Sequence, residues 1–176
     1  KIEVFAHGAL CMCYSGQCAM SALIGQRSGN RGRCAQPCRL CYRMDGAEGH
    51  LLSTRDLCSL NRLQALAGAG VDSFKIEGRL KSPEYVAATT RAYRRAIDAA
   101  LEGKPVPAPR RANDLYAMQM AFSRGFSTGW LDGTDHPLLT HGRFGKKRGQ
   151  DICRGCGKPL ETHRADARKV CRYEGS

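Results

Sequence analysis

The chain has 176 residues, of which 42% are hydrophobic, and this suits one globular domain with at most a small appendage. Its 28 Lys and Arg outnumber its 16 Asp and Glu, and the net charge of +12 favours RNA, DNA or an anionic metabolite as partner, although a merely soluble basic surface explains it equally well. No signal peptide and no apolar run of membrane-spanning length is visible, so we expect a cytoplasmic chain without a membrane partner.

Strand and helix patterns alternate along the first part of the chain. A short strand is predicted over 1–6 and ends at His7, and a Cys-, Gly- and Arg-rich segment over 9–43 follows with a helical piece near 18–24. A second short strand is predicted at 51–52. The next helix is predicted from a stripe of four leucines, Leu57, Leu60, Leu63 and Leu66.

The second part continues the same alternation. A third strand is predicted over 71–77, and a long helix over 82–101 begins with Pro83, a residue that suits the first helical turn. A stiff proline-containing linker over 105–109 then precedes a short helix over 115–122. This order of strands and helices indicates α/β units.

Ten cysteines are many for a chain of this size, and in a cytoplasmic protein we expect them to bind metal rather than form disulfides. Four of them share a segment rich in arginine and glycine: Cys11, Cys18, Cys34 and Cys38. The last two are close enough in sequence for one helical turn or tight loop to present both thiolates to one point. The arginines favour the thiolate form, and the glycines let the backbone wrap closely around a compact group.

Four thiolates suit either zinc or an iron–sulfur cluster. Structural zinc sites usually show two short Cys pairs, whereas this segment has one, so the spacing favours a [4Fe–4S] cluster. Free buried cysteines are the third possibility, because Cys packs as a small hydrophobe. Three further cysteines are interpreted as bystanders: Cys13, Cys41 and Cys58. Any of them could replace one of the four ligands.

Several long stretches of the sequence resemble the collagenase-like peptidase family, U-32. The stretches are EVFAHGALC at 3–11, YSGQC at 14–18, GNRGRCAQPCR at 29–39, KIEGRLK at 75–81 and RGFSTG at 124–129. The resemblance covers about residues 1–149. It implies that the cluster ligands are Cys11, Cys18, Cys34 and Cys38.

The resemblance implies hydroxylation more than proteolysis. Family members carry a [4Fe–4S] cluster, and several take part in oxygen-independent hydroxylation of tRNA uridine, 23S rRNA cytidine or a quinone precursor. The RNA-directed members are linked to prephenate as the hydroxyl source. The Arg-rich stretch 28–38 is most similar to the rRNA branch, so we expect an enzyme whose partners are RNA and a small anionic metabolite such as prephenate.

The expected fold class is α/β, the C-terminal part of a TIM-like barrel with a Cys-rich cluster-binding segment and a small Cys-containing tail. Residues 1–104 are the expected barrel portion and contain the cluster segment. Residues 105–149 are expected to be a linker and basic helical extension, and 150–176 a zinc-knuckle tail. The sequence opens at Lys1, and the half-barrel that precedes this region in the family is missing, so we expect a fragment that needs that half-barrel to complete its site.

Charged residues at strand ends are the candidates for chemistry, because sites in α/β units usually lie there. Lys75, Glu77 and Arg79 alternate along the third strand and are predicted to point the same way. We expect Lys75 and Arg79 to bind an anionic substrate, and Glu77 and His7 to act as catalytic proton carriers. The alternatives are a structural charge network and a turn-capping histidine.

A basic, Gly-rich stretch after residue 142 is predicted to contact RNA through three residues: Arg143, Lys146 and Lys147. In the tail, a zinc site is predicted from three cysteines: Cys153, Cys156 and Cys171. His163 is the candidate fourth ligand. A disordered tail is equally consistent with the sequence.

Two further functions stay open at the level of the sequence. One is a peptidase, as the family name states, although no Ser or Cys protease constellation and no HExxH helix stands out. The other is a non-catalytic, zinc-stapled RNA-binding module.

Overall fold

The computed structural model describes residues 1–78 and 81–142. Its centre is a four-stranded sheet in the order β5-β1-β4-β6, in which β5 and β1 are parallel, β1 and β4 antiparallel, and β4 and β6 parallel. These strands are β1 (Glu3–Ala9), β4 (Asp56–Cys58), β5 (Ser73–Ile76) and β6 (Phe126–Ser127). The sheet brings together segments that are far apart in the sequence.

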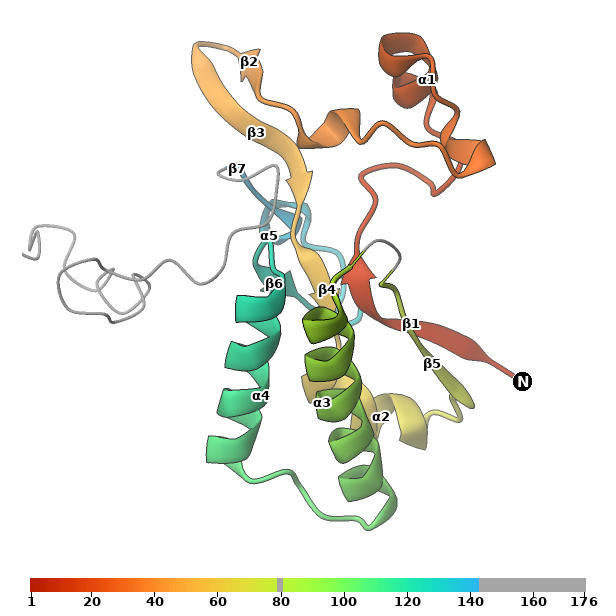
Figure 1. The fold of residues 1–176 in the computed structure, drawn as a ribbon, viewed down its shortest axis with the longest axis vertical. Coiled ribbons are helices and arrows are strands. Elements are labelled where there is room, and N and C mark those ends of the chain that lie inside the picture. The colour runs from red at the N-terminus through yellow and green to blue at the C-terminus, as the bar shows by residue number, and fades with distance from the viewer. Residues whose placement is uncertain (79–80, 143–176) are drawn as a thin grey trace, which may run out of the picture.

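A second, antiparallel sheet has the order β2-β3-β7 and projects away from the first (Figure 1). It contains β2 (Tyr42–Met44), β3 (Ala47–Thr54) and β7 (Thr140–Gly142). Asp45 and Gly46 both have positive φ at the tip of the β2–β3 hairpin, which matches the right-handed twist of its strands. The mixture of strands and helices confirms the α/β class. Neither sheet closes into a barrel within the described residues, so the barrel portion stays a prediction.

Five α-helices accompany the sheets in the described part of the chain: α1 (Ala19–Gly25), α2 (Leu63–Gly68), α3 (Pro83–Leu101), α4 (Ala108–Ala121) and α5 (His136–Leu139). The two long helices α3 and α4 lie side by side below the sheet (Figure 1). Short 3-10 turns, η1 (Gly29–Arg31), η2 (Pro37–Arg39) and η3 (Leu60–Arg62), complete the fold. No helix in the described ranges is both long and apolar enough to cross a bilayer.

Helix α3 begins where the sequence predicts it. The Ser82 side chain accepts a hydrogen bond from the Tyr85 backbone N–H at 3.4 Å, and Pro83 occupies the first turn, where its missing N–H costs nothing. An ion pair between Arg95 and Asp114, at 2.5 Å, then joins α3 to α4. The two helices therefore form one packed layer.

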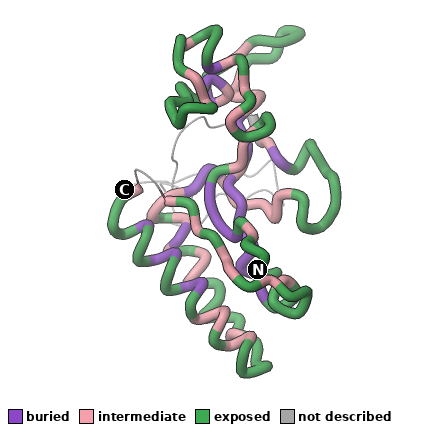
Figure 2. The backbone as a smooth tube through the Cα atoms, turned by 90° about the vertical axis from the view of Figure 1, so that its right-hand side faces the viewer, coloured by how far each residue is buried: buried purple, intermediate pink, exposed green. Residues whose placement is uncertain are grey.

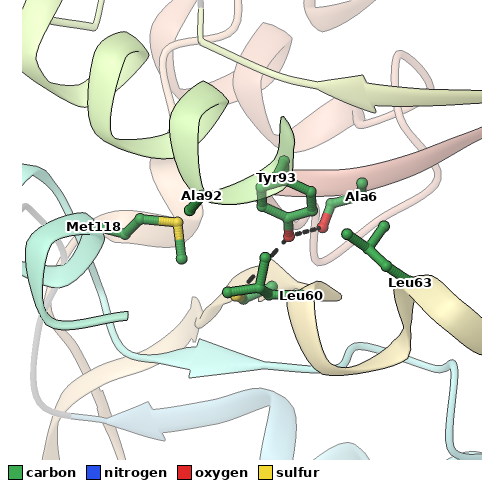
Figure 3. Packing of buried hydrophobic residues seen from close by; sticks show 7 residues of the cluster. Ala6, Leu60, Leu63, Ala92, Tyr93 and Met118 are labelled. Carbon is green, nitrogen blue, oxygen red and sulfur yellow. Dashed lines mark hydrogen bonds between the residues drawn. The ribbon is translucent and has the colours of Figure 1, made fainter. Parts of the chain in front are cut away.

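The core lies between this layer and the central sheet. Tyr93 of α3 reaches the sheet, while Leu60 and Leu63 close the core from below and Met118 enters it from α4 (Figure 3). The Tyr93 hydroxyl donates a hydrogen bond to the Ala6 carbonyl at 2.7 Å. A buried aromatic ring with a satisfied hydroxyl contributes both apolar area and a fixed orientation between helix and sheet.

Several element boundaries differ from the sequence-based expectation, and three of the differences have a clear cause. Strand β1 continues through His7 to Ala9, because His7 pairs with Cys58 in β4. Leu57, predicted on a helix, lies in β4 and pairs with β1 and β6, so sheet pairing overrides the leucine spacing. Helix α4 begins at Ala108 rather than near residue 115, because Pro109 fits its first turn.

Candidate functional site

Four cysteines lie on the segment that leaves the sheet at the end of β1. Cys11 follows the strand, Cys18 stands at the N-cap of α1, Cys34 precedes η2, and Cys38 lies within η2. All four are free thiols with partial or full exposure. Most of this segment is exposed, in contrast to the buried strands beneath it (Figure 2).

The Cys38 thiol is affected electrostatically by the three others. Burial raises the pKa of the Cys38 thiol, the neighbouring Arg39 lowers it, and negative charge on Cys11, Cys34 and Cys18 raises it further. The three other sulfurs therefore lie within electrostatic range of Cys38. Arranging thiolates that repel one another is costly unless a cation or a metal group lies between them.

The four thiols are the donors that a metal group would need. No group of three or more His, Cys, Asp or Glu side chains in residues 1–78 and 81–142 is arranged to hold a metal ion. Thiolates around one zinc would lie only about 3.8 Å apart, given Zn–S bonds of about 2.3 Å. In an iron–sulfur cluster each thiolate binds its own iron, so wider spacing suits it. The Gln36 backbone N–H also donates to the Cys34 sulfur at 3.3 Å, and hydrogen bonds to ligand sulfurs tune the potential of iron–sulfur clusters.

The other predicted bystander cysteines have separate surroundings. Cys58 is buried in β4, where the Tyr93 hydroxyl lies 3.9 Å from its sulfur. Cys13 and Cys41 are exposed, and the Cys41 sulfur lies 3.8 Å from the Glu48 carboxylate. These positions offer natural controls for experiments on the four-cysteine set.

Arg39 ties the cysteine segment to the sheet. Its guanidinium is only 9% exposed and donates to the Leu10 carbonyl at 2.9 Å, the Thr54 carbonyl at 2.5 Å and the Ser53 hydroxyl at 3.0 Å. The Thr54 hydroxyl also donates to the Leu10 carbonyl, at 2.7 Å. The ends of β1 and β3 are thus held by one buried cation next to Cys38.

A buried ion pair lies next to this arginine. Asp56 accepts two hydrogen bonds from Arg124, one from the side chain at 2.8 Å and one from the backbone N–H at 2.9 Å. The two residues are 3% and 5% exposed. Burial nevertheless raises the pKa of Asp56, against the opposing effect of Arg124, Arg39 and Lys81. Three cations therefore surround one buried carboxylate.

Lys81, the third cation, rests on aromatic rings at the start of α3. Its ammonium lies 3.1 Å from the Phe122 ring centroid and 5.8 Å from that of Tyr85. Burial lowers the pKa of Lys81 to about 8, with Arg124 and Arg39 acting in the same direction and Asp56 and Glu77 against it. Because an amine with this pKa changes charge near neutral pH, Lys81 is a candidate for chemistry.

His7 lies at the same end of β1, between aromatic rings. It is 1% exposed, and its Nδ1 atom lies 3.4 Å from the Tyr93 hydroxyl. The rings of Tyr85, Tyr93 and Phe126 pack within 6 Å of it. Burial lowers the pKa of His7 to about 4, so the imidazole is neutral at neutral pH and can accept or relay a proton.

Glu77 lies above Gly8, next to His7. The Glu77 backbone N–H donates to the His7 carbonyl at 2.8 Å, and the Tyr85 hydroxyl donates to the Glu77 carbonyl at 2.9 Å. The Gly8 φ is +142°, and a methyl group there would meet the Glu77 Cβ atom at 2.6 Å. Gly8 therefore permits the close approach of Glu77 to β1.

The remaining predicted site residues divide into two groups. Lys75 is half exposed at the edge of the sheet, 3.9 Å from the Glu3 carboxylate and 5.1 Å from the Phe5 ring centroid. The others lie outside the described residues: Arg79, Arg143, Lys146, Lys147, Cys153, Cys156 and Cys171. Roles for all of these residues stay predictions.

Three charged residues of the site are not among those predicted from the sequence: Asp56, Lys81 and Arg124. Arg39 was expected only as one of the arginines that favour the thiolate form of the cysteines, and it does lower the pKa of Cys38. Asp56 and Arg124 are far apart in the chain, and a charge in an unremarkable loop gives no sign of burial. A weak signal existed, because Lys81 and Arg124 lie at the ends of the stretches KIEGRLK and RGFSTG.

Comparisons with known proteins agree on one family. The model of peptidase family U32 matches residues 1–140. The chain is 49% identical over 108 residues, 57% of its length, to the 23S rRNA 5-hydroxycytidine C2501 synthase of Escherichia coli (strain K12), of which this covers 16%. It is 38% identical over 157 residues to a collagenase of Porphyromonas gingivalis, covering 84% of this chain and 42% of that protein.

A third relative is also named for RNA hydroxylation. The chain is 41% identical over 112 residues to tRNA hydroxylation protein P1 of Bacillus subtilis (strain 168), covering 56% of this chain and 26% of that protein. The chain thus spans less than half the length of each of these three relatives. No solved structure matches it.

Proposed function

Since the chain belongs to peptidase family U32, we propose that it is the cluster-bearing part of an iron–sulfur enzyme that hydroxylates RNA. Two of the relatives described above are named for hydroxylation of rRNA or tRNA. A net charge of +12 suits a polyanionic substrate. The proposal covers rRNA cytidine and tRNA uridine as substrates, in a cytoplasmic enzyme.

The observation that carries this proposal is the grouping of four free thiols around Cys38. None of them forms a disulfide, none is fully buried, and the charge on Cys11, Cys18 and Cys34 affects the Cys38 thiol. A purely structural set of cysteines would be expected to lie buried and separate, as Cys58 does. The cofactor in this proposal is a [4Fe–4S] cluster on these four residues.

A cluster would supply one-electron chemistry next to the substrate, and the surrounding residues have distinct tasks. Arg39 fixes the backbone beside two of the ligands and keeps a positive charge close to them. His7 is neutral at neutral pH, so its ring keeps one unprotonated nitrogen, and it is the first proton carrier in this scheme. Glu77, above Gly8, is the second proton carrier in this scheme.

The hydroxyl source in this proposal is a small anion such as prephenate rather than molecular oxygen. The cations that surround Asp56 would bind the negative charge of this anion. The rings of Tyr85 and Phe122 would exclude water from one side of the bound anion. The rest of the barrel, contributed by a longer protein, would complete the site. Basic residues after position 142 are proposed to hold RNA.

Metal analysis of anaerobically purified protein tests the cluster. We expect a brown protein with about four irons per chain, and Cys38→Ser should lose most of that iron. Cys13→Ser and Cys41→Ser are matched controls, because both residues are exposed in the same segment but are not proposed ligands, and they should keep it. A colourless wild-type protein that contains zinc instead would refute the cluster.

The RNA substrate is tested separately. Mass spectrometry of rRNA and tRNA from a strain lacking the corresponding gene should show the loss of one hydroxylated pyrimidine. The full-length gene should restore it, and the same gene carrying Cys38→Ser should not. Unchanged RNA in the deletion strain would remove hydroxylation from the proposal while leaving the metal result intact.

Peptidase activity is the second candidate, because a relative that covers 84% of the chain is named a collagenase. It predicts cleavage of gelatin by the purified protein whether or not iron is present. The same metal-replete and metal-free preparations should therefore be incubated with gelatin. Cleavage by both, abolished by one side-chain substitution, would favour the peptidase over the hydroxylase.

A further inference from the structure

The two ring nitrogens of His7 have different surroundings. The Nδ1 atom lies 3.4 Å from the hydroxyl oxygen of Tyr93, whereas the Nε2 atom has no hydrogen-bond partner among residues 1–78 and 81–142. A neutral imidazole carries its single proton on either nitrogen, and the nitrogen without it is the one that can take up a further proton. The contact at Nδ1 therefore decides which nitrogen of His7 is the base.

The Tyr93 hydroxyl directs its one hydrogen at the Ala6 carbonyl. The two oxygens lie 2.7 Å apart, and two oxygens at this distance need a hydrogen between them. The carbonyl has none, so the hydroxyl is the donor. The Cys58 sulfur, 3.9 Å from the hydroxyl oxygen, is a more distant and weaker acceptor. Burial also raises the pKa of Tyr93, so the hydroxyl keeps its proton at neutral pH.

The remaining contacts of the Tyr93 oxygen therefore involve its lone pairs. The Ser59 backbone N–H donates to this oxygen at 3.0 Å and also to the Ala6 carbonyl at 2.9 Å. The Nδ1 atom of His7 thus faces an oxygen that has no further hydrogen to donate. An unprotonated Nδ1 would bring two lone pairs together in a site where both rings are 1% exposed, whereas an Nδ1–H group donates a hydrogen bond.

The backbone holds these groups in place. His7 and Ala6 are neighbours in β1, and the pairing of His7 with Cys58 in β4 brings the Ser59 N–H to the same point. Tyr93 reaches this point from α3, and its ring meets the His7 ring edge-on with the centroids 5.5 Å apart. Close packing of this kind opposes rotation of either side chain.

We propose that Tyr93 is a positioning residue that holds His7 as its Nδ1–H tautomer and so makes Nε2 the nitrogen that takes up a proton. When Nε2 gains a proton, the ring becomes a cation, and Nδ1–H continues to donate to the Tyr93 oxygen. Loss of that proton restores the same neutral tautomer, so the ring can act repeatedly without turning. The use of Nε2 in catalysis rests on the proposed function, whereas the tautomer does not.

NMR spectroscopy reads the tautomer of His7 directly. In a long-range proton–nitrogen correlation spectrum of the isotope-labelled whole chain at neutral pH, protonated and unprotonated ring nitrogens differ in chemical shift. The pattern of cross-peaks distinguishes Nδ1 from Nε2. The chain has five histidines, and the signals that are absent from His7→Phe belong to His7. We expect a protonated Nδ1 and an unprotonated Nε2, and a protonated Nε2 in the wild type would overturn the inference whether or not any variant folds.

Tyr93→Phe removes the oxygen beside Nδ1 and keeps the ring. The ratio of the Nδ1–H to the Nε2–H tautomer of His7 should fall about fivefold or more, as expected for the loss of one ordinary hydrogen bond. Tyr85→Phe is the matched control, because the Tyr85 ring also packs on His7 but its hydroxyl donates to the Glu77 carbonyl at 2.9 Å. This control should leave the ratio unchanged. An unchanged ratio in Tyr93→Phe, or an equal fall in both variants, would remove Tyr93 from the role.

This inference and the proposed function can fail separately. Unchanged RNA in the deletion strain would refute hydroxylation without altering the spectrum of His7. A protonated Nε2 would refute the positioning role of Tyr93 without restoring the hydroxylated pyrimidine to the RNA of that strain.

Discussion

The guanidinium of Arg39 donates a hydrogen bond to the carbonyl oxygen of Leu10 at 2.9 Å. Leu10 directly precedes Cys11, and Arg39 directly follows Cys38. One side chain therefore connects the backbone next to the first cysteine of the set with the backbone next to the last. The segment between these two cysteines is largely exposed.

Replacing Arg39 should loosen this connection. Arg39→Met removes three hydrogen bonds and is expected to lower the free energy of unfolding by about 3 kcal/mol, measured by urea denaturation. Anaerobically purified Arg39→Met should also retain less iron than the wild type. Arg43→Met, which removes an exposed ion pair with Glu48, should change neither quantity appreciably. Equal free energies of unfolding for the two variants would show that the hydrogen bonds of Arg39 do not stabilise the fold.

His7 should make stability depend on pH in the acid range. Its pKa is about 4 in the folded chain and 6.5 in the unfolded chain, so the unfolded state binds the extra proton between these values. Stability from this group is full above pH 6.5 and falls by about 3 kcal/mol as the pH drops to about 4.

His7→Phe preserves an aromatic ring among Tyr85, Tyr93 and Phe126 but cannot be protonated. Urea unfolding at neutral pH and at about pH 4 should show a smaller difference for this variant than for the wild type. The comparison cancels the opposite effect of Asp56, whose raised pKa makes its burial more costly as the pH rises. An identical change in the free energy of unfolding between the two pH values in both proteins would exclude His7 as the titrating group.

A methyl group at Gly8 should strain the sheet. Gly8→Ala is expected to cost about 2 kcal/mol or more in thermal or urea unfolding, because φ is +142° and the new Cβ would meet Glu77 at 2.6 Å. Gly68→Ala is the matched control, since nothing lies within 4 Å of its added methyl group and Ala favours the helix α2. The control should be neutral or stabilising, and a similar loss in both would contradict the steric argument.

The Tyr93 hydroxyl should contribute to the contact between α3 and β1. Tyr93→Phe removes the bond donated to Ala6 and the bond accepted from the Ser59 N–H, at an expected cost of about 1–2 kcal/mol. Tyr116→Phe, at an exposed position of α4, should cost nothing measurable. The difference in urea midpoint between the two variants is the measurement, and no difference would assign Tyr93 to apolar packing alone.

Local patterns predicted the elements whose causes are local. The Ser82-Pro83 start of α3 and the helical piece at α1 follow from capping and spacing, and both are confirmed. Leu57 was assigned to a helix because leucine spacing is compatible with either structure until a partner strand is known. Pairing with β1 and β6, which are distant in sequence, decided its conformation.

The site was predicted unevenly for the same reason. Cys38 and its three companions can be proposed as ligands from residue type alone, since a cluster needs thiolates in any fold. Arg39, by contrast, looks like one of many arginines, and only the approach of β1 and β3 gives it buried acceptors. Asp56 and Arg124 are 68 positions apart in the sequence, so no short window of sequence could reveal the pair.

Strand β5 lies at the border of the central sheet and pairs only with β1 among the described strands. The amide and carbonyl groups on its outer edge can pair with a strand of another copy of the chain. The exposed side chains of Ile2 and Phe5 nearby add apolar surface that favours such association. Lys75 and Glu3 place charges there that discourage stacking of copies. Neutralising both would turn this border into the first point of aggregation when the chain is concentrated.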